Sequence, residues 1–559
     1  MAGLKYFDVT DHGATGKGTV DDTNAIITTE SKCEAKGGGV VYFPPGTYLV
    51  SRTMTIGLSG VQWRGTGAGS STILSAPTTG GAPTVVQTTS GVSNVQFRDL
   101  AFLGNQSAGT TVAPPVLVFS GGQGHKLLDC FFKWNTGQTA QFLGVKNVEV
   151  TRCRFYQVGN PSNTNTGTAY RTDALVAAAD SMNVNSIGVN IHHNHFDTCY
   201  FGAIYVAGMQ CDVSHNFITN AAVTGIYFNN TNTLIAFNSI QSTTRLAGAT
   251  TQCAGIQANS ASDFSVMGNN VGGGAGDGIA ITNGWAYGIV MGNNCLNNGQ
   301  SGIVTVGDSG IKILSDQSGG IPVNQSLTVV GNTCSDNQQS GHQTQTYGIH
   351  IDTTNGSQAY NGVLAGNSTF GNTSTGHTGQ GIYESHPVMA DDSNTIIGNS
   401  DWLERLHTSA PMSMTTKGFT SPGPIASATI NAGSMRQRCG IRITAAGTIN
   451  GTSAPKVFQL GFQATQGAST NIFNFTTAIP ISSPQPWQLI ATITNNQNAT
   501  TQQAVLAMFY LNNTLYKSFE LTLTSQDTSA TQYVTLSAMG ASGSTTDYVQ
   551  CDFLLAERC

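Results

Sequence analysis

The first 400 residues repeat one short phrase of apolar and polar positions. An apolar residue stands three positions before a fixed position and another usually stands two after it, as in Ile191-x-x-Asn194-x-Phe196. The phrase returns at Asn216 and Asn238, each time after 22 residues. The column comprises Leu100, Cys130, Cys153, Asn194, Asn216, Asn238, Asn269, Asn293, Asn332, Asn367 and Asn399. Such a repeat with variable insertions is typical of a solenoid, in which each repeat forms one coil and loops absorb differences in length.

The asparagines in this column predict how the coils stack. Parallel strands lie ~4.8 Å apart, so equivalent residues of successive coils lie directly above one another. Buried asparagines stacked in this way can bond each side-chain amide to the next, as Asn ladders do in cross-β structures. The pattern therefore predicts an all-β fold, a parallel β-helix. A Gly- and Asn-rich β-sandwich with accidental periodicity is the alternative.

A second strand follows each column residue and is usually written Gly-Ile-x. The strands of this kind include Ala174–Val176, Ala203–Tyr205, Gly225–Tyr227, Gly255–Gln257, Gly278–Ala280, Gly302–Val304, Gly348–His350 and Gly381–Tyr383. Alternation turns the middle residue inward and the last one outward. We expect the outward Tyr205, Tyr227 and His350 to bind substrate, with the two tyrosines stacking on sugar rings. Ordinary surface aromatics, or contact with a neighbouring subunit, are the alternatives for the tyrosines.

Residues 1–60 predict a cap for the open end of the solenoid. Asp21 or Asp22 can cap a helix that runs to about Ala35, and Gly37–Gly39 would end it. An uncovered end would expose unpaired strand edges and apolar core, so a lid is physically required. We therefore interpret this segment as a structural cap rather than a binding motif.

The same segment carries a resemblance to a known family. Phe7–Gly16, Asp21–Ile26 and Val40–Tyr48 resemble the N-terminal signature of the pectate-lyase-like β-helix superfamily, as found in bacteriophage tailspikes and capsular depolymerases. The repeated phrase extends the resemblance to about residue 400. It implies a right-handed β-helix, a homotrimer and a C-terminal domain used for trimer formation or carbohydrate binding. It implies no single activity, because the superfamily includes lyases, hydrolases, epimerases and non-catalytic members.

The character of the sequence changes after about residue 400. The Asn column ends, Pro411, Pro422 and Pro424 interrupt the chain, and alternating strands separated by turn residues follow. We expect the β-helix to occupy residues 61–405, a linker 406–430 and an antiparallel β-sandwich 431–559.

Composition narrows the possible partners. Only 9% of the residues are charged, against ~25% in an average domain. The formal net charge of −6 over 559 residues argues against nucleic acid and leaves neutral or mildly charged sugars as partners. The 11 cysteines are scattered singly and predict small buried apolar residues in a reducing compartment. No apolar stretch is long enough to span a bilayer, so membrane insertion is not expected, and the N-terminus shows no secretion signal.

Three long insertions leave the solenoid at one turn, before the second strand. They follow Cys153, Asn238 and Asn332 and would form walls, with troughs between them for a polymer. Glycosidases use pairs of carboxylates, ~5–5.5 Å apart in retaining and ~6.5–9.5 Å apart in inverting enzymes. Coils ~4.8 Å apart can supply both separations.

We expect Asp173 and Asp197 to be the catalytic acid and base across the first trough, beside Arg171 and above the floor formed by Tyr205 and Tyr227. Each aspartate alone could instead cap a turn. A second set near the third wall consists of Asp308, Asp352, His350 and Glu384. For a lyase, Arg171 would neutralise a uronate and the base would be one of His193, His215 and Tyr200. We expect no metal and no cofactor, because neighbours in the His192–His195 stretch point to opposite faces of a strand.

Together these features predict a phage tailspike, made in the host cytoplasm and carried on the virion. It would bind a bacterial surface polysaccharide (capsule, exopolysaccharide or O-antigen) and depolymerise it. Its other partners would be its own copies in a homotrimer and phage tail or baseplate proteins. Glycosidic hydrolysis is favoured because paired acids are easier to find than a Lys/Arg-based lyase centre. A non-catalytic receptor-binding spike or adhesin, and a polysaccharide lyase acting by β-elimination, are the alternatives.

Overall fold

The computed structural model describes residues 5–76, 84–104, 114–159, 173–243, 253–300, 308–314, 325–338, 343–352, 361–370, 372, 380–384, 395–397, 405–408, 414–417, 423–430, 440–450, 456–463, 471–477, 484–495, 503–523, 532–539 and 548–558. The chain forms two compact units, Met1–Asn399 and Ser400–Cys559. Each unit is described by itself.

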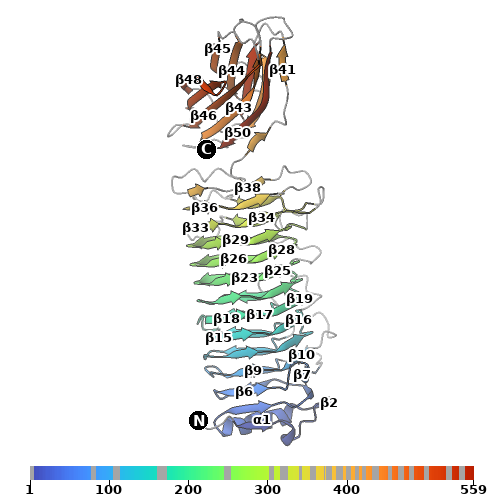
Figure 1. The fold of residues 1–559 in the computed structure, drawn as a ribbon. Coiled ribbons are helices and arrows are strands. Elements are labelled where there is room, and N and C mark those ends of the chain that lie inside the picture. Colours follow the sequence, from blue (N-terminus) through green and yellow to red (C-terminus); the bar gives the residue numbers. More distant parts are fainter. Residues whose placement is uncertain are drawn as a thin grey trace. The chain divides into compact units, whose positions relative to one another are not determined.

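The first unit is a parallel β-helix, whose coils stack regularly in Figure 1. Each coil contributes one strand to each of three series, here called sheets 1, 2 and 3. Sheet 1 holds the strands before the column residues: β1 (Tyr6–Asp8), β3 (Gly39–Tyr42), β6 (Val61–Arg64), β9 (Gln96–Arg98), β12 (Lys126–Leu128), β15 (Lys146–Thr151), β18 (Ile187–His192), β21 (Asp212–Ser214), β24 (Leu234–Ala236), β27 (Ser265–Met267), β30 (Ile289–Met291), β33 (Gln325–Val330), β36 (Asn361–Ala365) and β39 (Thr395–Ile397).

Sheet 2 follows the column residues: β2 (Lys17–Asp21), β4 (Gly46–Val50), β7 (Ser71–Ser75), β10 (Ala101–Leu103), β13 (Phe131–Lys133), β16 (Arg154–Val158), β19 (His195–Cys199), β22 (Phe217–Thr219), β25 (Ser239–Gln241), β28 (Asn270–Gly272), β31 (Asn294–Leu296), β34 (Thr333–Ser335) and β37 (Ser368–Phe370). Sheet 3 completes each coil: β5 (Met54–Ile56), β8 (Val86–Thr88), β11 (Leu117–Ser120), β14 (Ala140–Leu143), β17 (Leu175–Ala178), β20 (Gly202–Val206), β23 (Thr224–Thr231), β26 (Ala254–Ser262), β29 (Asp277–Ala286), β32 (Ser309–Leu314), β35 (Tyr347–Asp352) and β38 (Gln380–Glu384).

The predicted asparagine ladder is confirmed. Asn216 is 2% exposed, and its Oδ1 accepts hydrogen bonds from the backbone N–H and the Nδ2 of Asn194, at 3.0 and 3.1 Å. Its Nδ2 donates to Asn238 Oδ1 and Ile191 O, at 3.0 and 2.9 Å. Equivalent bonds continue to Asn367, while Asn399 lies outside the described residues. The ladder satisfies polar groups that would otherwise be buried without partners.

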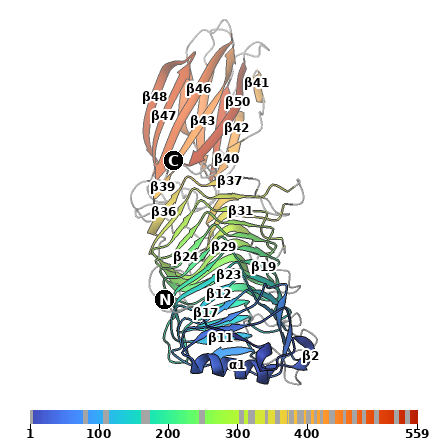
Figure 2. The same cartoon turned by 60° about the horizontal axis from the view of Figure 1, so that its bottom comes forward.

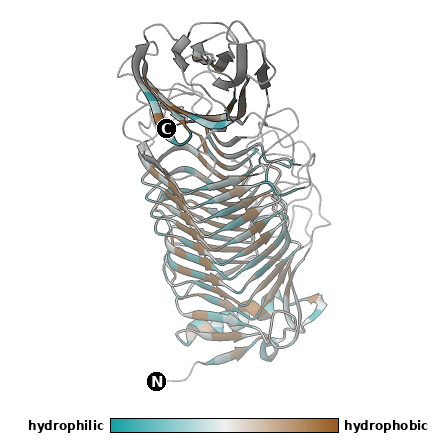
Figure 3. Ribbon diagram, turned by 45° about the horizontal axis from the view of Figure 1, so that its top comes forward, coloured by the Kyte–Doolittle hydropathy of each residue, from teal (hydrophilic) through white to brown (hydrophobic). Residues whose placement is uncertain are grey.

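The apolar positions also stack from coil to coil, as the brown stripes in Figure 3 show. Inside sheet 2, Phe102, Phe132, Phe155 and Phe196 form a continuous stack, with ring centroids 5.1, 5.0 and 4.5 Å apart and planes within 8°. Burying one such ring stabilises the fold by roughly 1.5–3 kcal/mol. All nine cysteines of the described residues are buried and free, as predicted for small apolar residues. Because the phenylalanines and the asparagines each stack in the same register from coil to coil, they fix how the coils align.

The predicted cap helix is α1 (Thr23–Ala35), which follows the short 3-10 helix η1 (Thr10–His12) and lies across the first coil in Figure 2. Asp22 occupies its N-cap position without a side-chain cap bond. Asp21, one residue earlier, accepts the N–H of the first helical residue, Thr23, through its Oδ1 at 3.0 Å. Among the described residues, no helix is long and apolar enough to cross a membrane.

One predicted strand of sheet 3 is wrong. The strand of that coil is β32, in which Ile311 and Lys312 pair with Ile279 and Ala280 of β29. Residues 301–307, which include Val304, lie outside the described residues. The outward residue beside Ala280 is therefore Lys312. Gly302-Ile303 and Gly310-Ile311 read alike in sequence, so the apolar phrase alone could not choose between them.

The second unit consists of two antiparallel sheets, as predicted for a β-sandwich. The larger sheet contains β40 (Arg405–Thr408), β41 (Met414–Lys417), β43 (Gly440–Asn450), β46 (Gln485–Asn495), β47 (Gln503–Leu511), β48 (Thr514–Leu523) and β50 (Tyr548–Arg558). The smaller contains β42 (Gly423–Ile430), β44 (Lys456–Gln463), β45 (Asn471–Thr477) and β49 (Gln532–Met539). Trp487, Phe458 and Phe509 lie in its core. The expected linker at 406–430 is wrong, because β40 and β41 pair with β50 and β42 pairs with β49.

Candidate functional site

The outer face of sheet 2 gathers aromatic and basic side chains on four neighbouring strands. Along β13, β16, β19 and β22 the burial pattern alternates, so every second residue turns away from the core. We call this surface the basic–aromatic face and define it by Phe131, Lys133, Trp134, Arg154, Tyr156, His195, Asp197 and Phe217. The strands pair in register, with Phe131 beside Arg154, Arg154 beside His195 and His195 beside Phe217. The face is thus built on strands rather than on loops.

Cations and rings are interleaved on this face. Lys133 Nζ lies 3.6 Å from the ring centroid of Trp134 and 5.5 Å from that of Tyr156. Arg154 lies 5.5 Å from the Phe131 ring and 5.9 Å from the Tyr156 ring. Such cation–π contacts hold the long basic side chains against the sheet while leaving the charge able to meet a ligand.

Most other basic residues of this region are neutralised by carboxylates. At the corner where sheet 1 turns into sheet 2, Arg152 holds Asp129 through two hydrogen bonds of 2.7 and 2.9 Å. Lys126 pairs with Glu149 at 2.7 Å. By contrast, within the described part of the chain no ion pair joins Lys133 or Arg154 to a carboxylate. The face therefore keeps two cations whose charge is available to an anionic partner.

Histidines lie on the corner and on the face. His193 and His215 are exposed, and their rings stack 5.0 Å apart. His195 is half-buried and contacts the Phe217 ring at 5.0 Å. Desolvation lowers the pKa of His195, the nearby Arg154 charge lowers it further, and Asp197 opposes both. His195 is therefore neutral at neutral pH and able to accept a proton.

Asp197 is the carboxylate at the centre of the face. It is half-buried and its Oδ1 accepts hydrogen bonds from the hydroxyls of Thr198 and Thr219, at 3.0 and 3.3 Å. Tyr156 pairs beside it on the preceding coil. The catalytic role expected for Asp197 stays a prediction.

Asp173 does not face a trough, contrary to expectation. It is 0% exposed and its Oδ1 occupies the space where a Cβ at Gly202 of the next coil would lie. Four coils further on, Asp277 stands at the same position. There its Oδ1 accepts the backbone N–H groups of Asp308 and Ser309, at 3.0 and 2.9 Å. Asp173 thus lies at a buried position that joins coils, which is the turn-capping alternative.

The predicted substrate-binding residues differ in exposure. Tyr205 and Tyr227 are neighbours in the outward column, and their rings stack 5.3 Å apart. Tyr227 is only 8% exposed, so Tyr205 alone offers a half-exposed ring. His350 is 6% exposed and contacts the Tyr347 ring at 4.6 Å, which contradicts an outward binding role. Arg171 lies outside the described residues.

The second carboxylate set is also not an open site. Asp308 is 5% exposed and its backbone N–H is held by Asp277. Asp352 pairs with Leu314 at the end of β35, and the side chains of Asp352 and Glu384 lie outside the described part. No group of three or more His, Cys, Asp or Glu residues that could hold a metal ion occurs among the described residues.

Sequence reasoning missed most of the basic–aromatic face. The signal was present as alternate residues after each column position: Phe131-x-Lys133, Arg154-x-Tyr156 and His195-x-Asp197. The outward column of sheet 3 is easier to recognise in the sequence, because its Gly-Ile pattern is more regular. The corresponding strands of sheet 2 are short, which makes their outward residues harder to align.

Comparison with known proteins finds one matching family model and several solved structures of low sequence identity. Residues 6–280 match the family described as rhamnogalacturonase A/epimerase, pectate lyase-like, which confirms the resemblance to the pectate-lyase-like superfamily for this part of the chain. No curated protein matches the chain. Among solved structures, the Dettilon tailspike protein is 14% identical, with 98% of this chain and 94% of that chain covered and a TM-score of 0.46.

Two further structures are similar. Bacteriophage CBA120 tailspike protein 2, in its enzymatically active domain, is 13% identical, with 99% of this chain and 82% of that chain covered and a TM-score of 0.47. The surface adhesin PfbA of Streptococcus pneumoniae is 17% identical, with 71% and 89% covered and a TM-score of 0.49. Identities this low leave activity and substrate open.

Proposed function

We propose that this protein is a phage tailspike that binds a bacterial surface polysaccharide along the basic–aromatic face and depolymerises it there. The observation that supports the proposal is the gathering of exposed rings and available cations on one strand-built surface. Trp134 and Phe217 are 38% and 40% exposed, and exposed apolar groups collected in one patch mark interaction sites. Aromatic surfaces with a few placed polar groups are typical of ligand sites.

Hydrolysis, the reaction favoured by the sequence, would use Asp197 together with a second carboxylate. Asp173 is buried, and Asp129 is held by Arg152. The insertions at 160–172 and 244–252 contain no Asp or Glu. A hydrolytic site would therefore take its second carboxylate from another subunit of the proposed homotrimer.

β-Elimination from a uronate requires nothing beyond this face, and the described residues support it best. A base removes the proton next to the sugar carboxylate, a cation neutralises that carboxylate, and an acid protonates the departing glycosidic oxygen. His195, whose pKa is lowered, can act as the base, Arg154 as the cation and the Tyr156 hydroxyl as the acid. Asp197 would orient His195 and stabilise its protonated form.

In this proposal the protein is a homotrimer on the virion, attached to phage tail or baseplate proteins, and is made in the host cytoplasm. The test is incubation of the protein with a panel of purified capsular, exopolysaccharide and O-antigen preparations. Absorbance at 235 nm reports unsaturated products of elimination, and new reducing ends without that absorbance report hydrolysis. Retention of a polysaccharide without any cleavage would instead identify a non-catalytic receptor-binding spike or adhesin.

A matched pair of variants ties the activity to the face. Arg154→Gln should abolish elimination, because it removes the cation that neutralises the uronate. Lys126→Gln removes a basic residue that is already paired with Glu149 and should leave turnover unchanged. Equal activity of both variants would remove the basic–aromatic face from the mechanism.

A further inference from the structure

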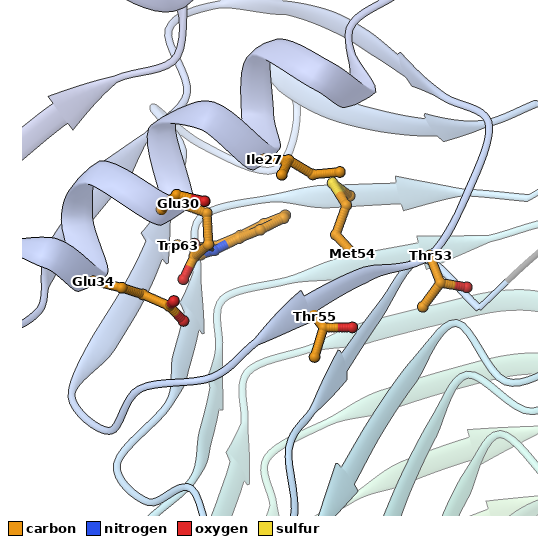
Figure 4. Close-up of a pocket in the computed structure, with 8 residues that line it drawn as sticks. Ile27, Glu30, Glu34, Thr53, Met54, Thr55 and Trp63 are labelled. Carbon is orange, nitrogen blue, oxygen red and sulfur yellow. Dashed lines mark hydrogen bonds between the residues drawn. The ribbon is translucent and has the colours of Figure 1, made fainter.

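A pocket of about 250 Å³ lies at the capped end of the solenoid (Figure 4). None of its lining residues belongs to the basic–aromatic face. It opens between α1 and the strands β5 and β6. Ile27, Glu30 and Glu34 reach it from one side of α1, because residues three and four apart share a helix face. Met54, Thr55 and Trp63 line the opposite side. The pocket is smaller than the ~300–1,000 Å³ of typical small-molecule sites.

Glu30 is a buried carboxyl group with one oxygen unused. Its side chain is 4% exposed, and its Oε2 accepts the indole N–H of Trp63 at 2.6 Å. Its Oε1 is buried and has no hydrogen-bond partner within the described part of the chain. Buried polar groups normally have partners, and once Glu30 is ionised this oxygen requires a donor that the described residues do not supply.

Glu34 adds a second carboxylate one helical turn away. Its Oε1 accepts the backbone N–H groups of Gly57 and Leu58, at 2.5 and 3.0 Å, which anchors the side chain at the pocket. Ile27 and Met54 supply apolar surface next to the two acids. The pocket thus combines acceptors at one place with an apolar wall.

We propose that this pocket binds a primary alkylammonium group, such as a lysine side chain or a free amine. An ammonium group has three donors and no acceptor, which matches the carboxylate oxygens of Glu30 and Glu34. Its alkyl stem can lie against Ile27 and Met54, as amphipathic side chains do on apolar surfaces. Two carboxylates disfavour an anionic ligand. Within the described part, the site lacks the third ligand group that a metal ion would need.

Binding should be linked to ionisation of Glu30. Burial raises the pKa of Glu30 to about 8, the Glu34 charge also raises it, and the Trp63 hydrogen bond opposes both. The neighbouring Cys33 thiol has a pKa raised to about 12 and stays neutral. Glu30 is therefore mostly protonated at pH 7, and an ammonium ion would have to displace that proton.

The test is calorimetric titration of the full-length protein with n-butylammonium chloride at pH 7 and pH 9, in buffers of different ionisation enthalpy. If only the ionised carboxylate binds, the ionised fraction limits affinity, so affinity should rise about tenfold from pH 7 to pH 9. Nearly one proton should be released per ligand at pH 7. Nα-acetyl-lysine methylamide represents a protein side chain and cadaverine a free diamine. Whichever of these two compounds binds more tightly indicates whether the natural ligand is a protein side chain or a free amine.

Three variants and a neutral probe complete the test. Glu30→Gln keeps an oxygen for the Trp63 N–H and should weaken binding more than tenfold, and Glu34→Gln should weaken it several-fold. Glu149→Gln, a change on the surface of β15, should leave binding unchanged. Equal binding of n-butanol, binding retained in Glu30→Gln, or affinity that falls with rising pH would each overturn the proposal. If Glu30→Gln fails to fold, the pH dependence and proton release of the unaltered protein decide.

Discussion

Replacing Asn216 by leucine removes one link of the asparagine ladder and leaves a side chain of similar branching. The backbone N–H of Asn194 loses its acceptor, Asn216 Oδ1, and is left buried without a partner. Asn194 Nδ2 keeps its bond to Val150 O at 2.9 Å, and Asn238 Oδ1 keeps the backbone N–H of residue 216. Both lose one bond.

The magnitude follows from these losses. One buried group left without a partner costs ~1–3 kcal/mol, and each lost bond whose partners stay satisfied costs less. We expect Asn216→Leu to lower the free energy of unfolding by about 2–4 kcal/mol. The assay is urea unfolding followed by circular dichroism, in which the urea concentrations at the unfolding midpoint are compared and the m-value is expected to stay constant. If refolding is incomplete, unfolding rates measured under the same conditions replace the equilibrium comparison.

Asn270→Leu is the matched control. Asn270 is an exposed asparagine of sheet 2, and its Oδ1 accepts a hydrogen bond from Asn294 at 3.1 Å on the surface. An exposed substitution of this kind should change stability by no more than about 0.5 kcal/mol. If Asn216→Leu were as stable as Asn270→Leu, the ladder would not be what holds the coils in register.

Four further outcomes follow from the structure. Asp197→Asn should lower turnover on a cleaved polysaccharide by orders of magnitude, whereas Asp173→Asn should lower the melting temperature and leave the turnover of folded protein unchanged. Trp134→Ala should weaken polysaccharide binding about tenfold in a calorimetric or surface-binding assay. Since the pKa of His195 is lowered from its ordinary value near 6.5, the acid limb of a pH–rate profile should lie below that value, where His195 becomes protonated. The pKa of Glu30 is raised to about 8 in the folded state, so the unfolded state loses this proton first as the pH rises. The free energy of unfolding should therefore decrease between about pH 4.5 and pH 8, by up to ~1.4 kcal/mol per pH unit. Glu30→Gln should flatten that part of the stability profile.

The fold of the first unit could be predicted because its repeat is dictated by burial. Each coil must place an apolar or amide-bonded residue at the same buried position, so such residues recur periodically in the sequence. Asn194, Asn216 and Asn238 show this repeat at equal spacing. The failures have local causes. Gly302-Ile303 and Gly310-Ile311 carry the same phrase, and only pairing with β29 selects the second. Pro424 suggested a linker, yet β42 is an edge strand of its sheet, where proline is tolerated.

The candidate site was less predictable. Asp197 lies half-buried on the outer face of sheet 2, and its catalytic role stays a prediction. Asp173 was paired with it from loop lengths alone. Whether a turn aspartate points outward or toward the next coil depends on the space above it, which Gly202 provides here. Likewise, the outward column of sheet 3 was recognised, while the burial of Tyr227 and His350 depends on neighbouring side chains that the period does not encode.

The central claim is that the basic–aromatic face binds and cleaves a bacterial surface polysaccharide. The most direct test is to find a polysaccharide that the protein retains and to compare the unaltered protein with Arg154→Gln for product release, measured both at 235 nm and by reducing ends. The account predicts unsaturated products from the unaltered protein and none from the variant. Full product release by Arg154→Gln, or the absence of any retained polysaccharide across a broad panel, would contradict it.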